Sequence, residues 1–227
     1  MFGEQMSNVE CNDRFAFAAQ AAEPLDNPIN CLMKRTLDLA VAIPVVCFVL
    51  PPLTLLVAIA HRLQSPGPVF HRQERSGLNR QIFHIFKFRT MQVGSEAQRG
   101  TQATRDDSRV FPFGRFLRKT SLDEFPQFIN VLLGEMSVSG PRPHLLEHDQ
   151  KFAAMVGSYY MRHFVKPGIT GLAQSEGFRG EVIGRPELLQ KRIDHDLRYV
   201  NIWSLELDLR IIASTARQVV RPPRAAY

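Results

Sequence analysis

Two adjacent carboxylates, Asp123 and Glu124, are the residues in this chain whose types and spacing most directly suggest chemistry. They follow a basic pair that ends at Lys119 and come shortly before Pro126. One interpretation is structural, because Ser121 and Glu124 have the spacing of a capping box at a helix start. The other is that the helix begins at Pro126 and leaves the pair on the preceding loop. In both cases the positive end of a helix faces the carboxylates, and such an end also attracts phosphate.

A stiff segment follows at Pro141-Arg142-Pro143. The two prolines restrict the backbone, so Arg142 is presented with little ordering cost. Arginine suits forked contacts to phosphate or stacking on a base. The alternative is a rigid turn whose arginine is simply solvated.

Two more basic motifs could contribute to an anion site. Residues 166–171 read KPGITG, where glycines permit close backbone approach and Lys166 could join backbone N–H groups around a phosphate. The motif is not a Walker-type loop. Residues 87–90 read KFRT, which on its own is more typical of a half-buried strand with a solvated polar face.

One long apolar segment must position these motifs. Residues 39–60 are 22 residues without charge, enough for a helix to cross a bilayer core. A secretory signal is excluded by the length of the run and by the acidic stretch before it. A straight membrane-spanning helix is opposed by Pro51 and Pro52, which remove two backbone donors near its middle. Basic residues flank both ends, so we expect a re-entrant helix-break-helix with both ends cytoplasmic.

Composition and charge narrow the function classes. The chain has 227 residues and a net charge of +6, of which +8 falls on residues 61–119, directly after the apolar run. This positively charged segment could bind anionic lipid headgroups or phosphate substrates. The apolar content excludes a disordered chain, and three cysteines, all within the first 47 residues, exclude a disulfide framework or a zinc site. A reduced, cytosol-facing chain is the default.

The remaining patterns predict an α+β fold that is mainly helical, with a few short strands. Residues 1–33 are expected to be a mobile tail, residues 34–62 the re-entrant membrane helix, and residues 63–227 the catalytic domain. Within that domain we expect a hairpin over 66–91, a polar loop over 92–108, helices over 121–133, 145–164 and 186–200, and a membrane-surface helix over 205–220.

Together these residues resemble the bacterial sugar transferases, the monotopic phosphoglycosyl transferases. The resemblance covers residues 34–227 and preserves the order of the family's motifs. It rests on Lys34-Arg35, the apolar run, SPGPVF from Ser65, KFRTM from Lys87, LRKTSLDE from Leu117, NVL from Asn130, GPRP from Gly140, PGITG from Pro167 and Trp203-Ser204.

The resemblance implies a reaction and its partners. A sugar-1-phosphate would move from a UDP-sugar to undecaprenyl phosphate, releasing UMP and starting a surface polysaccharide at the bacterial inner membrane, with the catalytic domain in the cytosol. Asp123 would attack the sugar-bearing phosphorus and form a covalent phosphosugar-aspartate, with Mg²⁺ bound near it. Glu124 would assist or position the lipid phosphate. The implied substrate-binding residues are Lys87, Arg118, Pro141, Arg142, Pro143, Arg162, Lys166 and Arg179.

The chain departs from the family at the membrane break, where Pro51-Pro52 replaces the usual Ser-Pro. The stretch from His144 to Glu181 most resembles members that transfer glucose-1-phosphate, with galactose-1-phosphate or another hexose phosphate as the alternative. A membrane-tethered binder of anionic polymer is a further alternative, but it gives no reason for Asp123-Glu124 beside so much positive charge. We expect no nucleic-acid partner and leave a homodimer open.

Overall fold

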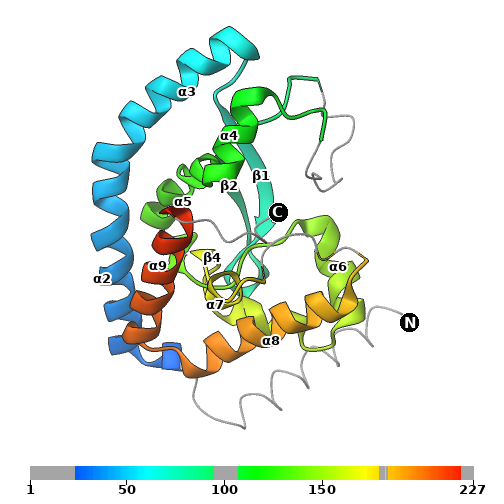
Figure 1. Ribbon diagram of the computed structural model, residues 1–227. Helices are drawn as coiled ribbons and strands as arrows, with labels where there is room; N and C mark the ends of the chain where they lie inside the picture. The colour runs from blue at the N-terminus through cyan, green and yellow to red at the C-terminus, as the bar shows by residue number, and fades with distance from the viewer. Residues whose placement is uncertain (1–23, 95–106, 179–181, 183, 221–227) are drawn as a thin grey trace.

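The computed structural model describes residues 24–94, 107–178, 182 and 184–220, and it is mainly helical with four short strands among them (Figure 1). The mainly helical α+β class is therefore confirmed. The helices of the described chain are α2 (Pro28–Pro44), α3 (Leu50–Gln64), α4 (Pro112–Thr120), α5 (Gln127–Leu133), α6 (Leu146–Met155), α7 (Leu172–Ser175), α8 (Pro186–Ile202) and α9 (Leu205–Val220).

The apolar run forms one long bent helix along one side of the molecule (Figure 1). It extends over residues 28–64 as α2, a π-helical turn at Val45–Val49, and α3. Pro51 and Pro52 lie in the first turn of α3, directly after the π turn, and Pro44 closes α2. A proline removes a helical hydrogen bond, and the wider π turn absorbs that loss. The prolines therefore bend the helix without breaking its helical backbone.

The helix begins earlier than the expected boundary between the tail and the membrane segment. The side chain of Asn27 accepts a hydrogen bond from the backbone N–H of Ile29 at 2.9 Å, and Pro28 occupies the first turn. Both features favour a helix start. The last residues of the segment expected as a tail, from Pro28 onward, are thus helical.

One side of the long helix packs against the domain and the other is open. Ala42 and Val57 are fully buried against the domain. Phe48 and Leu63, in contrast, are 78% and 80% exposed. The helix is long and apolar enough to cross a membrane, and its exposed apolar side is compatible with a membrane anchor.

Polar side chains on the inner side of α2 tie it to the domain. The Lys34 ammonium donates to Asp208 of α9 at 2.8 Å and to the hydroxyl of Tyr199 at 2.8 Å. Asp38 accepts from the hydroxyl of Ser137 and the backbone N–H of Val138, both at 2.8 Å. These bonds fix β3 (Ser137–Ser139), the strand that leads into the Pro141-Arg142-Pro143 turn.

The hairpin expected over residues 66–91 is confirmed. Strands β1 (Phe70–Ser76) and β2 (Ile82–Phe88) pair antiparallel, and the turn between them places Asn79 and Arg80 at positive φ. Asparagine tolerates this conformation better than most residues. β2 carries Lys87 toward the candidate site.

The helix expected over 121–133 is wrong in its first half. α4 ends at Thr120, Ser121 is left-handed with φ 57°, and a 3₁₀ turn covers Leu122–Glu124 before α5 begins at Gln127. The Ser121 side chain makes no capping bond, so the capping-box interpretation is also wrong. Pro126 caps α5 instead, as its missing N–H allows.

The helix expected over 145–164 is divided as well. Val156 has an extended backbone and Gly157 follows it, which separates α6 from a 3₁₀ segment at Tyr159–Phe164. Glycine disfavours helix continuation. The helix expected to start at Pro186 is confirmed as α8.

Two glycines let β3 approach β4 (Gly168–Thr170) more closely than any side chain would allow. The strands pair in parallel, Gly140 donates to the carbonyl of Thr170 at 2.8 Å, and Gly168 donates to the carbonyl of Pro141 at 3.0 Å. A Cβ on Gly168 would lie 2.1 Å from the backbone nitrogen of Gly140. The glycine at the centre of the KPGITG motif therefore serves backbone packing.

Candidate active site

A short turn between α4 and α5 presents the two carboxylates. Ser121 turns the chain, and the following 3₁₀ turn carries Asp123 and Glu124. Their neighbours Leu122 and Phe125 pack against the apolar cluster beneath α3 and α4. Because the flanking side chains are anchored in the core, the turn that carries the two carboxylates is fixed in place.

Glu124 is held by two cations. Its Oε1 accepts from the Lys87 ammonium at 2.7 Å, and Arg142 donates to both of its oxygens, at 2.5 and 3.0 Å. Burial alone would raise the pKa of Glu124, but Arg142 and Lys87 outweigh burial and hold that pKa well below its usual range. Glu124 is therefore ionised at neutral pH and organises both cations.

Asp123 has a different environment. Among the described residues, no side chain donates a hydrogen bond to its carboxylate, although the charges of Lys87, Arg118 and Arg142 act on it. Burial, and next the negative charge of Glu124, raise the pKa of Asp123 to about 6. An ionised carboxylate without a hydrogen-bond partner, inside a ring of cations, is suited to nucleophilic attack on a phosphorus atom.

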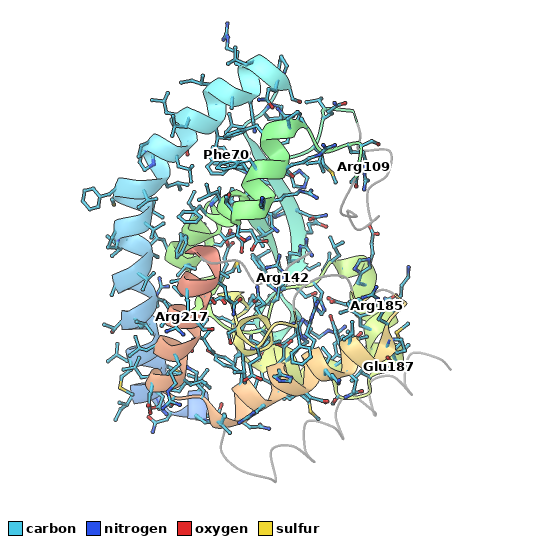
Figure 2. All side chains as sticks on the ribbon, in the orientation of Figure 1. Phe70, Arg109, Arg142, Arg185, Glu187 and Arg217 are labelled. Carbon is cyan, nitrogen blue, oxygen red and sulfur yellow. The ribbon has the colours of Figure 1, made fainter. Side chains whose placement is uncertain are left out.

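Arg142 is held from behind, and Figure 2 shows it near the centre of the molecule. The guanidinium of Arg162 donates to the carbonyl of Arg142 at 2.6 Å. Arg162 is itself fully buried and ion-paired with Asp196 of α8 at 2.7 Å. The buried guanidinium of Arg162 therefore faces Asp196 and the backbone of the Pro141–Pro143 turn.

The predicted site residues do not all come together. Lys87, Arg118, Asp123, Glu124 and Arg142 form one cluster, in which Arg118 is oriented by the Thr90 hydroxyl at 2.8 Å. Three predicted residues are not part of this cluster. Arg162 lies behind it, and the Lys166 ammonium lies beside Gly134 and the α2 residues Arg35 and Asp38. Arg179 falls outside the described residues.

Sequence reasoning missed Arg75 on β1. The hairpin register pairs it with Phe83, which is buried, so Arg75 lies on the inner face of the hairpin. Its charge acts on both Lys87 and Arg142. An arginine at an inward position of a predicted strand was the available signal.

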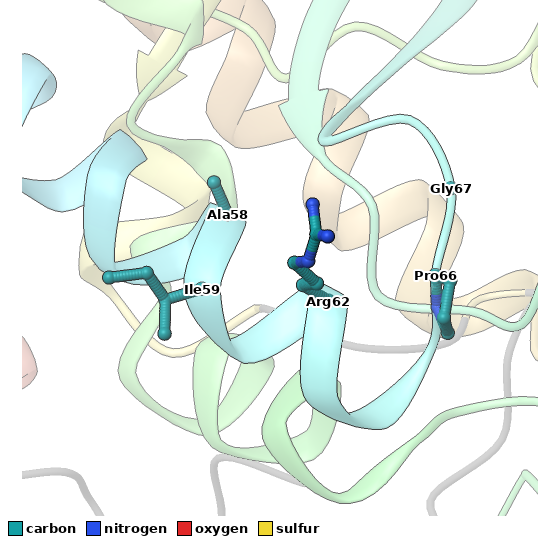
Figure 3. A pocket seen from close by; sticks show the side chains of 5 residues that line it. All are labelled: Ala58, Ile59, Arg62, Pro66 and Gly67. Carbon is teal, nitrogen blue, oxygen red and sulfur yellow. The ribbon is translucent and has the colours of Figure 1, made fainter.

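A hollow of about 620 Å³ lies at the end of α3 (Figure 3). Its lining consists of Ala58, Ile59, Arg62, Pro66 and Gly67. Arg62 is the charged residue among these five, and no carboxylate is among the described residues that line the hollow. None of these five residues belongs to the cluster around Asp123 and Glu124.

The residues that could hold a metal ion are few. Among the described residues, no group of three or more histidine, cysteine, aspartate or glutamate side chains converges. Glu124 is occupied by its two cations, which leaves the Asp123 carboxylate. One carboxylate with substrate phosphates and water is a common Mg²⁺ arrangement, so the residues fit a Mg²⁺ ion that enters with a phosphorylated substrate.

The raised pKa of Asp123 predicts a pH profile. Protonation removes the nucleophile, so kcat/KM for the donor substrate should fall about tenfold per pH unit below about pH 6 and be level above it. Glu124, with its lowered pKa, should add no inflection in this range. The profile is measured as initial rates between pH 5 and pH 8. A kcat/KM that stays constant down to pH 5 would contradict the assignment of Asp123.

Comparison with known proteins places the chain in a family. A family model described as "Bacterial sugar transferase" matches residues 29–222. Three relatives carry the name UDP-glucose:undecaprenyl-phosphate glucose-1-phosphate transferase. The Xanthomonas campestris protein is 51% identical over 174 residues, 74% of this chain and 35% of its own length. The Klebsiella pneumoniae protein is 46% identical over 83% of this chain and 40% of its own length. The Caulobacter vibrioides protein is 43% identical over 89% of this chain and 75% of its own length. The chain thus spans well under half of the first two relatives.

Proposed function

We propose that this chain, which belongs to the bacterial sugar transferase family, transfers glucose-1-phosphate from UDP-glucose to undecaprenyl phosphate. The observation that carries the proposal is the contrast within the carboxylate pair: Asp123 lacks a hydrogen-bond partner among the described residues, whereas Glu124 holds Lys87 and Arg142. The names of the relatives favour glucose over galactose. An anionic-polymer binder would not need an unpartnered aspartate inside a cationic cluster.

The first half-reaction forms a bond between an Asp123 carboxylate oxygen and the phosphorus that carries the sugar. The bond from that phosphorus to the bridging oxygen breaks, and UMP leaves with the electron pair. Lys87, Arg118 and Arg142 stabilise the charge on the phosphate oxygens. Mg²⁺, when bound, would neutralise part of the same charge. Glu124 keeps two of these cations in place because its pKa is low.

The second half-reaction transfers the sugar phosphate to lipid. An oxygen of undecaprenyl phosphate attacks the same phosphorus, the bond to Asp123 breaks, and the carboxylate is regenerated. One phosphoric anhydride is broken and another is formed, so no separate energy source is required. Covalent catalysis divides the displacement into two easier steps.

The identity of the released nucleotide tests this function. Incubation of the full chain with UDP-glucose and undecaprenyl phosphate should yield UMP and a lipid that carries glucose by a diphosphate. Release of UDP with a lipid monophosphate glucose would indicate glycosyl transfer and contradict the proposal. UDP-galactose in parallel distinguishes the two sugars, and lower turnover with UDP-glucose than with UDP-galactose would overturn the assignment of glucose.

We also propose that the long helix enters one leaflet and returns, with both ends in the cytoplasm. The bend at the π turn and Pro51-Pro52 supports this arrangement, as do basic residues at both ends, including Lys34 and Arg62. The inner bacterial membrane is the expected location, because the donor nucleotide sugar is cytoplasmic.

Cysteine labelling tests this topology. Cys31 precedes the apolar run and is exposed, and a Ser95→Cys variant provides a site after it. With Cys11 and Cys47 replaced by Ser, an impermeant thiol reagent should label neither position in intact cells and both in opened membranes. Labelling of Cys31 from outside would demonstrate a spanning helix.

A further inference from the structure

Arg75 is a cation of the site whose hydrogen bonds go to neutral atoms. Its guanidinium donates to the side-chain oxygen of Gln73 at 2.7 Å and to the carbonyl of Pro143 at 3.5 Å. Its Nε–H is buried and has no hydrogen-bond partner in the part of the chain that the structure describes. A buried N–H donor of a charged group costs free energy when it has no hydrogen-bond acceptor, and a bound ligand could supply that acceptor.

The hairpin directs Arg75 toward the site. Arg75 pairs with Phe83 and His71 pairs with Lys87, so Arg75 and Lys87 lie on the same face of the two strands. A backbone bridge between Arg75 and Leu145 then fixes it beside the end of the Pro141–Pro143 turn. Arg75 therefore lies where β1 meets the loop that presents Arg142.

The cationic cluster has a surplus of positive charge. Lys87 and Arg142 share Glu124, and Asp123 is the other carboxylate of the cluster. Arg75 forms no ion pair with any described carboxylate, and the same holds for Arg118. Burial, followed by the repulsion from Arg142, lowers the pKa of Arg75 to about 10. An added anion would relieve both effects.

We propose that Arg75 binds a phosphate oxyanion of a substrate, on the Arg142 side of the carboxylate pair. The proposal rests on the function proposed above and extends it to a residue that no sequence motif singled out. The oxyanion belongs either to the diphosphate of the sugar nucleotide or to the phosphate of the lipid acceptor. Arginine supplies both Nε–H and Nη–H as a fork for such an oxyanion.

Arg75→Gln tests the proposal, with Arg72→Gln as the matched control. Arg72 lies on the same strand, is exposed, and contacts the ring of Phe86. Two quantities are measured for each variant in detergent: the Kd for UDP by calorimetry, and the KM for undecaprenyl phosphate at saturating UDP-glucose. One of the two should rise roughly 10- to 100-fold in Arg75→Gln, the loss expected for a charge-assisted contact, and neither should change in Arg72→Gln.

The two constants separate the two sources of the oxyanion. A weaker Kd for UDP assigns Arg75 to the nucleotide diphosphate, whereas a raised KM for the lipid at unchanged UDP affinity assigns it to the acceptor phosphate. Arg75→Lys should recover part of the loss, because it keeps the charge but not the fork. If Arg75→Gln does not fold, Arg75→Lys alone should still raise one constant at least about threefold.

Both constants within twofold of the unmodified protein would overturn the proposal. That result differs from failure of the proposed function. Binding of UDP does not require transfer, so a chain that binds UDP through Arg75 but releases no UMP would contradict the function and leave the Arg75 assignment intact.

Discussion

Asp123→Asn is expected to reduce the formation of UMP and lipid product by about 10⁴-fold or more, as loss of a covalent nucleophile does in other enzymes. The amide is nearly the same size as the carboxylate but cannot attack phosphorus. Because Asp123 accepts no hydrogen bond from a described side chain, its replacement should leave the fold unchanged. Initial rates and a thermal unfolding curve check both parts.

Asp194→Asn is the matched control for this variant. Asp194 is an exposed residue of α8 that accepts a hydrogen bond from Gln190 at 2.8 Å. It makes no contact with the carboxylate pair in the described contacts. Its activity should stay within about twofold of the unmodified protein, as surface substitutions usually do. Substantial turnover by Asp123→Asn would show that another group is the nucleophile.

The second large effect is expected on stability. Gly168→Ala should lower the free energy of unfolding by about 3 kcal/mol, because its Cβ would lie 2.1 Å from the nitrogen of Gly140 and 2.3 Å from the carbonyl oxygen of Thr170. Both neighbours are backbone atoms, so no side chain can rotate away. Activity should fall together with stability, since the same contact supports the Pro141-Arg142-Pro143 turn.

Gly157→Ala provides the control for the close backbone contact between Gly168 and Gly140. A Cβ at Gly157 meets no atom within 4 Å, and its φ is not in the left-handed region. Its thermal midpoint should equal or slightly exceed that of the unmodified protein, because alanine restricts the unfolded chain. A Gly168→Ala variant as stable as Gly157→Ala would show that β3 and β4 do not approach as closely as described.

The features that sequence predicts well are those set by local signals. The hairpin of β1 and β2 follows from turn residues between two apolar-aromatic runs, and α8 begins at its proline. The Asp123-Glu124 pair stands out in the sequence because it comes shortly after the basic pair Arg118-Lys119. Pro51-Pro52 predicts a break in the apolar run, whereas the structure keeps a helical backbone over residues 28–64, with a π turn just before the pair.

The features that sequence misses depend on contacts between distant segments. β3 and β4 are three residues each and pair across about 30 residues of chain, so no periodicity reveals them. Arg162 carries the same charge as Arg142, but only the fold places it behind the turn, against Asp196. Ser121 has the spacing of a cap, but the structure places it in the left-handed region at the end of α4, where the 3₁₀ turn begins.

The central claim, a phosphosugar covalently bound to Asp123, is tested most directly by intact-protein and peptide mass spectrometry after incubation with UDP-glucose and no lipid acceptor. We expect a mass increase of one hexose phosphate per chain, located on the peptide that contains Asp123, with one UMP released per site. Addition of undecaprenyl phosphate should remove the adduct. UMP release without any adduct, or an adduct on a peptide that lacks Asp123, would contradict the account.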